Sequence, residues 1–176
     1  MAKSWLSIVA VLGVSGPALA ADPTGDWMVA NKLAVVRVAP CGDALCGNLA
    51  WTKGPPGTDQ NNPDPTKRNR SVIGMPILLD MKPNSSGNRW EGEIYNAEDG
   101  KIYSGSIALS HENVLRIEGC VLGFLCGGQN WARAKCEEAA STATVGRSPT
   151  ASKRSAPPAA ATPPLPSVTS CREVAP

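Results

Sequence analysis

Short apolar stretches that alternate with polar positions fill residues 22–136, and turn-forming residues separate them. Around Ile94 and Leu115, every second residue is apolar or small and its neighbours are charged. A period of two predicts β-strands with one buried face and one exposed face, and no apolar run keeps a helical period over helical length. The predicted strands span residues 24–29, 34–40, 47–53, 77–82, 89–96, 101–109, 114–121 and 128–135.

Most connections between these strands have the length of a hairpin turn. Asp99-Gly100 is the strongest turn signal, and residues 84–87 and 110–113 are also rich in turn-forming side chains. Consecutive strands joined by tight turns predict an antiparallel meander, which avoids bare edges by closing on itself. The predicted fold class is therefore all-β, a small antiparallel up-and-down eight-stranded barrel. Such a barrel is either filled by its own side chains or holds one small ligand.

The two ends of the chain do not follow the strand pattern. Lys3, an apolar run over residues 6–14 and small residues at 18–20 are typical of a signal peptide, which predicts a signal over residues 1–21. The apolar run is too short to span a bilayer, so no membrane span is expected after cleavage. Residues 137–176 hold seven Pro, nine Ala and no aromatic residue, which predicts a disordered tail. The barrel domain is expected over residues 22–136, in a periplasmic or secreted protein.

Six cysteines follow the expected cleavage site, and an even number in an exported protein predicts disulfides. The pairs Cys41–Cys46 and Cys120–Cys126 each flank one predicted turn, and these turns lie at opposite ends of the barrel. Pairing between the two turns would exceed the roughly 7 Å between Cα atoms that a disulfide tolerates. Local pairs are therefore predicted. Cys136 can pair with Cys171, which closes the tail into a loop, or Cys171 can pair with a partner molecule.

Charge and metal-ligand content argue against several classes of function. Residues 22–136 contain 12 Lys and Arg against 12 Asp and Glu, whereas nucleic-acid binding needs clustered positive charge. His111 is the only histidine, and the cysteine spacings fit neither a common zinc site nor covalent haem. Asp59, Asn61 and Asp64 offer oxygen ligands for calcium, but their spacing is not that of an EF-hand loop. We therefore expect no cofactor and, without a triad or phosphate loop, no enzyme.

The one long connection, residues 54–76, is polar and is expected to leave the barrel at the same end as Asp99-Gly100. Connections of this length usually carry function or move, so it is a candidate lid over the barrel mouth. Two interpretations are open. Arg68 and Arg70 can project together toward an anionic group, or the acidic residues of the loop pair with them. The candidate ligand-binding residues are Trp51, Asp59, Asn62, Asp64, Arg68, Arg70, Tyr95 and Tyr103.

Several short motifs occur in order across residues 24–135. They are Gly25-Asp26-Trp27 and residues 36–41, 45–51, 59–64, 68–70, 90–95, 99–103 and 131–133. On these motifs the chain resembles the DUF2147 family of exported bacterial proteins. The resemblance implies a compact, lipocalin-like β-barrel and brings no established activity. Trp27 in the first strand and Arg133 in the last are also similar to the closing contact of lipocalin-type barrels, where an arginine lies over an indole ring.

Together these features predict a non-enzymatic binding module. Its ligand would be a small apolar or amphipathic molecule in the barrel, or an envelope component that contacts the long loop. The alternative is a structural or protein-interaction module with a filled barrel and a tethering tail. The barrel interior separates the two, because ligand pockets occupy several hundred Å³, whereas a cavity below roughly 100 Å³ argues against ligand storage.

Overall fold

The computed structural model describes residues 22–122, 124–138 and 167–174, and these residues form nine strands and one short helix. The strands are β1 (Gly25–Met28), β2 (Ala34–Cys41), β3 (Ala44–Thr52), β4 (Pro76–Pro83), β5 (Trp90–Asn96), β6 (Lys101–His111), β7 (Val114–Val121), β8 (Leu125–Glu138) and β9 (Val168–Glu173). A 3₁₀ helix, η1 (Pro65–Lys67), lies between β3 and β4. The expected signal segment, residues 1–21, lies outside the described residues.

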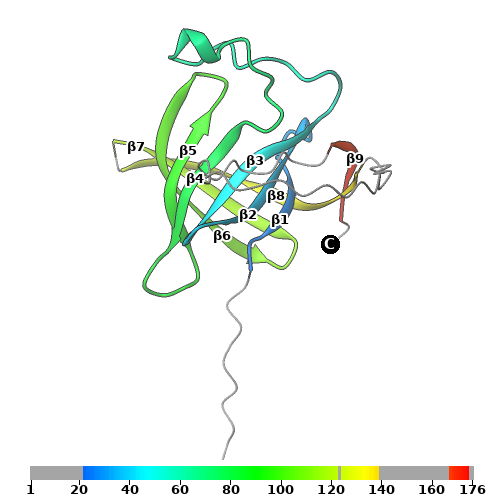
Figure 1. Cartoon of the computed structure of the whole chain (residues 1–176). Helices are drawn as coiled ribbons and strands as arrows, with labels where there is room; N and C mark the ends of the chain where they lie inside the picture. Colours follow the sequence, from blue (N-terminus) through cyan, green and yellow to red (C-terminus); the bar gives the residue numbers. More distant parts are fainter. Residues whose placement is uncertain (1–21, 123, 139–166, 175–176) are drawn as a thin grey trace, which may run out of the picture.

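The first eight strands pair antiparallel in chain order, and β1 also pairs with β8, so they close into a barrel (Figure 1). The predicted up-and-down eight-stranded barrel is therefore confirmed, and each predicted strand corresponds to one of β1 to β8. The largest shift in bounds is at β8. This strand is longer than predicted because it pairs with β7 over its first part and with β9 over its last part.

One end of the barrel interior is packed with large side chains. Trp27, Leu78, Met81, Ile107 and Leu115 are fully buried there, because alternate residues of a strand turn toward the same face. Burial of this apolar surface is the main favourable contribution to folding.

The contact between Trp27 and Arg133 closes this packed end, as the lipocalin resemblance implied. The Arg133 guanidinium carbon lies 4.2 Å from the centre of the indole ring. Arg133 Nη1 donates to the Thr24 carbonyl at 2.9 Å and Nε donates to the Glu112 carbonyl at 3.1 Å. The indole Nε1 donates to the Pro23 carbonyl at 2.9 Å. Every polar group of this contact named here therefore has a partner, as burial requires.

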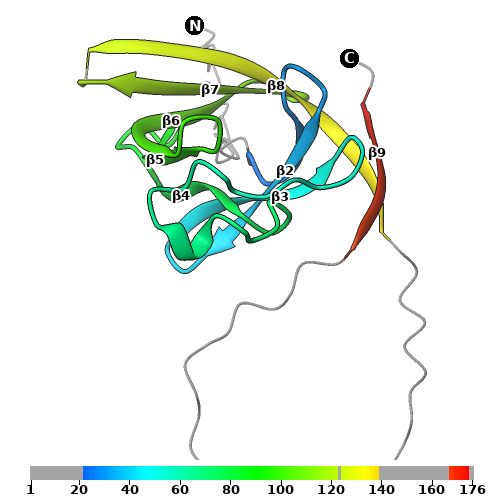
Figure 2. The ribbon, with the colours of Figure 1, turned by 90° about the horizontal axis from the view of Figure 1, so that it is seen from above.

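Strand β9 packs against the outside of the barrel, beside the last part of β8 (Figure 2). The Cys136–Cys171 disulfide joins the two strands. A second apolar cluster forms where Met28 and Val35 point outward from β1 and β2 and are covered by this β8–β9 pair, including Val168. These outward apolar residues need cover, and β9 supplies it.

The composition of residues 137–176 predicted a disordered tail, and this prediction is wrong for part of it. Residues 137–138 extend β8, and residues 168–173 form β9; residues 139–166 lie outside the described residues. The average composition of the tail concealed a short segment, Val168-Thr169-Ser170-Cys171, that suits a strand. The other two disulfides join Cys41 to Cys46 and Cys120 to Cys126, as predicted.

Candidate functional site

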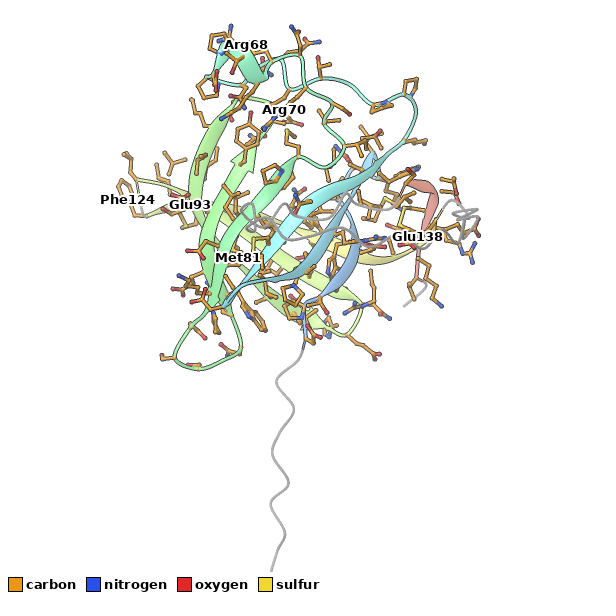
Figure 3. The ribbon with its side chains drawn as sticks, viewed as in Figure 1. Arg68, Arg70, Met81, Glu93, Phe124 and Glu138 are labelled. Atoms are coloured by element: carbon orange, nitrogen blue, oxygen red, sulfur yellow. A yellow bond between two sulfur atoms is a disulfide. The ribbon has the colours of Figure 1, made fainter. Side chains whose placement is uncertain are left out.

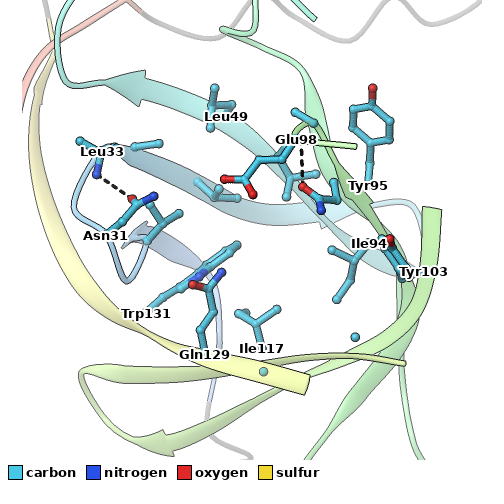
Figure 4. Close-up of a pocket in the computed structure, with 18 of the residues that line it drawn as sticks. Asn31, Leu33, Leu49, Ile94, Tyr95, Glu98, Tyr103, Ile117, Gln129 and Trp131 are labelled. Carbon is cyan, nitrogen blue, oxygen red and sulfur yellow. Dashed lines mark hydrogen bonds between the residues drawn. The ribbon is translucent and has the colours of Figure 1, made fainter. Parts of the chain in front are cut away.

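The other end of the barrel interior is hollow. A cavity of about 440 Å³ opens between the β1–β2 turn, the β5–β6 turn and the β7–β8 pair (Figure 4). Its walls are mainly apolar and come from the seven strands β2 to β8. The main wall residues are Val36, Leu49, Ile77, Ile94, Ile117 and Trp131.

The strands divide their inward-facing residues between this cavity and the packed core. Val36 lines the cavity, whereas Val38, two residues further along β2, is buried in the core. In β7, Ile117 lines the cavity and Leu115 belongs to the core alone. Inward-facing residues of one strand therefore line the cavity near one end of the barrel and fill the packed core near the other.

Glycines help to keep the cavity open on the side of β7 and β8. Gly119 and Gly127 lie directly opposite each other and both line the cavity. A Cβ atom added to Gly127 would have no other atom of the described residues within 4 Å, so a side chain at this position would enter open space. The absence of side chains at this pair therefore contributes to the cavity volume.

Polar groups lie mainly at the rim of the cavity. Asn31, Glu98 and Gln129 are exposed, and Figure 4 shows their side chains around the opening. Deeper in the wall, Trp131 is only 3% exposed, and within the described part of the chain its Nε1 has no hydrogen-bond partner, unlike the Nε1 of Trp27. A buried donor without an acceptor is uncommon in native proteins. The site thus combines an apolar interior with a polar rim and one unsatisfied indole N–H in its wall.

A buried polar network holds the long loop against the outside of the barrel. The Asp59 carboxylate, 1% exposed, accepts hydrogen bonds from the Tyr95 hydroxyl at 2.6 Å and from Asn62 Nδ2 at 2.7 Å. Arg70 donates to the same carboxylate through Nη2 at 2.8 Å and Nε at 3.0 Å. Three loop residues are thereby joined to β5 through Tyr95.

The network shifts the acid–base equilibria of its members. Burial by itself raises the pKa of Asp59, but hydrogen bonds from Tyr95, Asn62 and Arg70, with the Arg70 charge, outweigh it, so the pKa lies below its ordinary value. Burial, and then the hydrogen bond to Asp59 and its negative charge, raise the pKa of Tyr95. Asp59 is therefore an ionised, fully hydrogen-bonded carboxylate at neutral pH. It is a structural anchor rather than a general base.

The long loop is not a lid over the cavity, contrary to expectation. No residue from 54 to 76 lines the cavity. The loop instead contacts the β5–β6 turn from outside, where Asn61 Nδ2 donates to the Ala97 carbonyl at 3.2 Å and the Glu98 carbonyl at 2.9 Å. Gly100 has a φ of +69° and touches the Asn61 backbone so closely that a Cβ would collide with it. The loop thus buttresses one side of the cavity rim from outside.

The eight candidate residues from the sequence separate into three groups. Asp59, Asn62, Arg70 and Tyr95 come together in the network, and the last three line a hollow of about 410 Å³ under the loop. Although Tyr95 also borders the cavity, its ring points away from it (Figure 4).

The acidic and basic residues of the loop satisfy one another or the loop backbone. Asp64 caps η1 through the Thr66 N–H at 2.9 Å and pairs with Lys67 at 3.4 Å. Arg68 Nε donates to the Asn62 carbonyl at 2.8 Å, and Figure 3 shows Arg68 and Arg70 at separate places on the loop. The contacts favour the interpretation in which the loop charges pair among themselves. Arg68 and Arg70 do not form a joint anion site.

The last two candidate residues lie apart from the network. Tyr103 lines the cavity, and its hydroxyl donates to the Asp99 carboxylate. Trp51 lies on the outer face of β3, against the β8–β9 cluster, and borders a hollow beside Val168.

Most of the cavity wall was absent from the candidates. The candidates from the sequence are mainly polar loop residues, whereas the wall consists of ordinary inward-facing residues such as Leu49 and Ile117. Period-two alternation identifies such residues as inward-facing, but not whether a neighbour fills the space beside them. Of two glycines on inward-facing positions, Gly119 lines the cavity, whereas Gly92 lies against the β4 backbone.

Residues 22–122, 124–138 and 167–174 contain no group of three or more His, Cys, Asp or Glu side chains placed to hold a metal ion. In the same residues, no helix has the length and apolar character that crossing a membrane needs.

Comparisons with known proteins agree with this architecture. A family model described as "Uncharacterized protein conserved in bacteria (DUF2147)" matches residues 25–133. A solved structure described as "Protein HP1028 from the human pathogen Helicobacter pylori belongs to the lipocalin family" is similar, with a TM-score of 0.58 and 21% sequence identity. That similarity covers 64% of this chain and 82% of the other, and shows that the barrel is lipocalin-like. No curated protein matches the chain.

Proposed function

The chain belongs to the DUF2147 family, and we propose that it is a non-enzymatic, exported binding module that holds one small apolar or amphipathic molecule inside the barrel. The observation that carries this proposal is the cavity of about 440 Å³ with an apolar wall. Pockets for small molecules in proteins occupy roughly 300–1,000 Å³ and are mostly apolar with a few polar groups. The cavity agrees with both properties.

The cavity also weighs against the alternative of a filled barrel that only binds other proteins. A filled interior would leave less than roughly 100 Å³, and the observed volume is several times larger. The positions of the polar groups point to an amphipathic ligand. Its apolar part would contact Leu49 and Ile117, and its polar part would lie near Asn31 and Gln129 at the rim.

Export is part of the proposal, and three disulfides support it. Disulfides persist in oxidising compartments such as the bacterial periplasm and are rare in the cytosol. The pairs Cys41–Cys46, Cys120–Cys126 and Cys136–Cys171 are all formed. The cleavable signal over residues 1–21 would direct the chain there.

Native mass spectrometry of protein purified from the envelope or culture medium of its own host tests the proposal. We expect a co-purifying mass of a few hundred daltons that is released by organic solvent. In the cavity-filling variant Gly127→Leu, the liganded fraction should fall at least about tenfold, because the new side chain occupies the ligand's space.

A matched control separates filling of the cavity from a general effect of the substitution. Gly57→Leu makes the same chemical change on the exposed loop, where a Cβ also meets no atom within 4 Å. This variant should keep the ligand. A ligand-free wild-type protein that also fails to bind an apolar fluorescent dye would refute the proposal, as would equal ligand retention in Gly127→Leu.

A further inference from the structure

The exposed large apolar residues of the described chain are gathered at one end of the barrel. They are Leu33, Ile73, Ile102, Val121, Leu122, Phe124 and Leu125. All of them lie in, or next to, the four connections at the hollow end. The connections at the packed end, residues 42–43, 84–89 and 112–113, contain none.

Four of these residues form the tip of the ribbon made by β7 and β8. The ribbon extends past the barrel wall (Figure 2), and Phe124 lies at its far end (Figure 3). Leu122 is 79% exposed and Phe124, the only phenylalanine in the chain, is 72% exposed. Val121 and Leu125 lie beside them. We call Val121, Leu122, Phe124 and Leu125 the apolar tip.

We propose that the apolar tip inserts into the interfacial region of a lipid bilayer and so docks the protein on a membrane surface. The sequence around the tip is suited to this environment, because no charged residue occurs between Glu118 and Arg133. Charged side chains are the most costly to bring into the hydrocarbon region. Insertion of the apolar tip removes apolar surface from water, which is favourable, and brings no charged side chain into the hydrocarbon region.

The shape of the tip favours a bilayer over a protein partner. Four side chains at the end of a two-stranded ribbon expose a few hundred Å², whereas a standard protein interface buries roughly 800 Å² on each partner. The tip is also convex, so a protein partner would need a matching apolar hollow. A bilayer can accommodate such a projection without a preformed binding pocket.

The disulfide prepares the tip for this role. Cys120 and Cys126 lie directly opposite each other, and Val121 pairs with Leu125 in the next register position. The covalent bond joins the two strands at the base of the tip and restricts its conformations, so less conformational freedom is lost on docking. Among the described residues, β7 pairs with β6 as far as Cys120, but no strand pairs with the outer edge of β8 over residues 125–131. Unpaired backbone groups on that edge limit insertion to the interface, because they are costly in hydrocarbon.

Docking through the tip would bring the cavity toward the membrane. Gly119 and Gly127, at the base of the same ribbon, line the cavity. Small amphipathic molecules partition into bilayers, so a docked protein would meet its ligand at high local concentration. The membrane proposal goes beyond the binding proposal and stands without it, because the tip residues do not line the cavity.

Vesicle flotation tests the membrane proposal. The full exported protein, with its disulfides intact, is mixed with vesicles of zwitterionic phosphatidylcholine and separated on a density gradient. We expect wild-type protein to float with the vesicles. The double variant Leu122→Ser/Phe124→Ser should reduce the partition coefficient by at least about tenfold. Raising the salt concentration should change binding less than twofold, because no charge takes part in the tip.

Ile102→Ser is the control, since Ile102 is 55% exposed at the same end of the barrel, beside the β5–β6 turn, but does not belong to the tip. It should keep wild-type flotation. The proposal is overturned if wild-type protein stays unbound, if the double variant floats equally well, if the control loses as much, or if binding disappears at high salt. A dimer that forms without lipid and is lost in the double variant would identify a second copy as the occupant instead.

The two proposals can fail separately. In the double variant, native mass spectrometry should still detect the cavity ligand, and unchanged circular dichroism and disulfide content show that the barrel is folded. If the double variant no longer floats but keeps its ligand, the membrane proposal is supported independently of the binding proposal. Flotation of a wild-type protein that proves ligand-free supports the membrane proposal and refutes the binding proposal.

Discussion

The two ends of the barrel interior are built from the same strands and differ in what closes them. At the packed end, the fully buried Trp27 fills the space between the strands and Arg133 covers its ring. At the hollow end, Gly119 and Gly127 replace side chains, and the wall is supported from outside by the Asp59 network. We therefore expect the packed end to contribute more to stability, which would leave the hollow end available for the proposed ligand.

The packed end should be the most sensitive part of the molecule. Trp27→Ala removes a fully buried indole and should lower the free energy of unfolding by about 3–5 kcal/mol. Guanidinium denaturation of the protein with its disulfides intact measures this loss. A change below about 1 kcal/mol would show that the two ends do not differ in their contribution to stability.

Disruption of the Asp59 network should cause the second-largest loss of stability. Asp59→Asn should lower the free energy of unfolding by about 2–3 kcal/mol, because Tyr95, Asn62 and Arg70 all direct donors at this position. The estimate is below that for a fully buried ion pair because the Arg70 side chain is 36% exposed. Denaturation at pH 7 provides the measurement.

The effect of Asp59 should depend on pH in a defined direction. Its pKa in the folded protein is lower than in the unfolded chain, where an aspartate titrates near about 3.9. The stabilisation is therefore complete above that pH and is lost as the pH falls through the folded pKa. The difference between wild type and Asp59→Asn should be constant from pH 5 to 8 and shrink below about pH 4. A difference that grows on acidification would contradict the assignment of an ionised Asp59.

Tyr95→Phe separates the hydrogen bond from the charge in the same network. It removes one donor to Asp59 and should cost about 1–2 kcal/mol. The raised pKa of Tyr95 means that its contribution is complete below about pH 10 and is lost as the pH rises through the folded pKa. The alkaline loss of stability should therefore be smaller in the variant, as measured by denaturation at pH 8 and pH 11.

The hollow end should tolerate an added side chain. Gly127→Leu should change the free energy of unfolding by no more than about 0.5 kcal/mol, because the new side chain enters open space. The same denaturation experiment measures it. A loss above about 2 kcal/mol would mean that the cavity wall closes around this position, and the contrast between the two ends would disappear.

The sequence was sufficient for the barrel because strands of period two joined by short turns leave few other topologies. The same order of strands placed the cysteine pairs of the two hairpins correctly. It failed for β9, since a segment such as Val168–Glu173 becomes a strand only when β8 and an apolar outer face are beside it. Tertiary contacts override local composition in such cases.

The candidate site was predicted less well than the fold, for a physical reason. The charged loop residues attract attention in a sequence, yet Asp59 and Arg70 satisfy each other in the structure. The cavity wall consists of residues such as Ile94 and Ile117, whose pattern is the same whether they border a hollow or a packed core.

Local sequence by itself determined what each segment prefers: which residues form strands, which face each side chain takes, where the chain turns and which nearby cysteines can pair. Only the tertiary structure decided whether the barrel interior is full, what covers the outer face of β1 to β3, and which charges neutralise each other. These properties depend on the space left between side chains that are distant in the sequence, and alternation along one strand carries no information about that space.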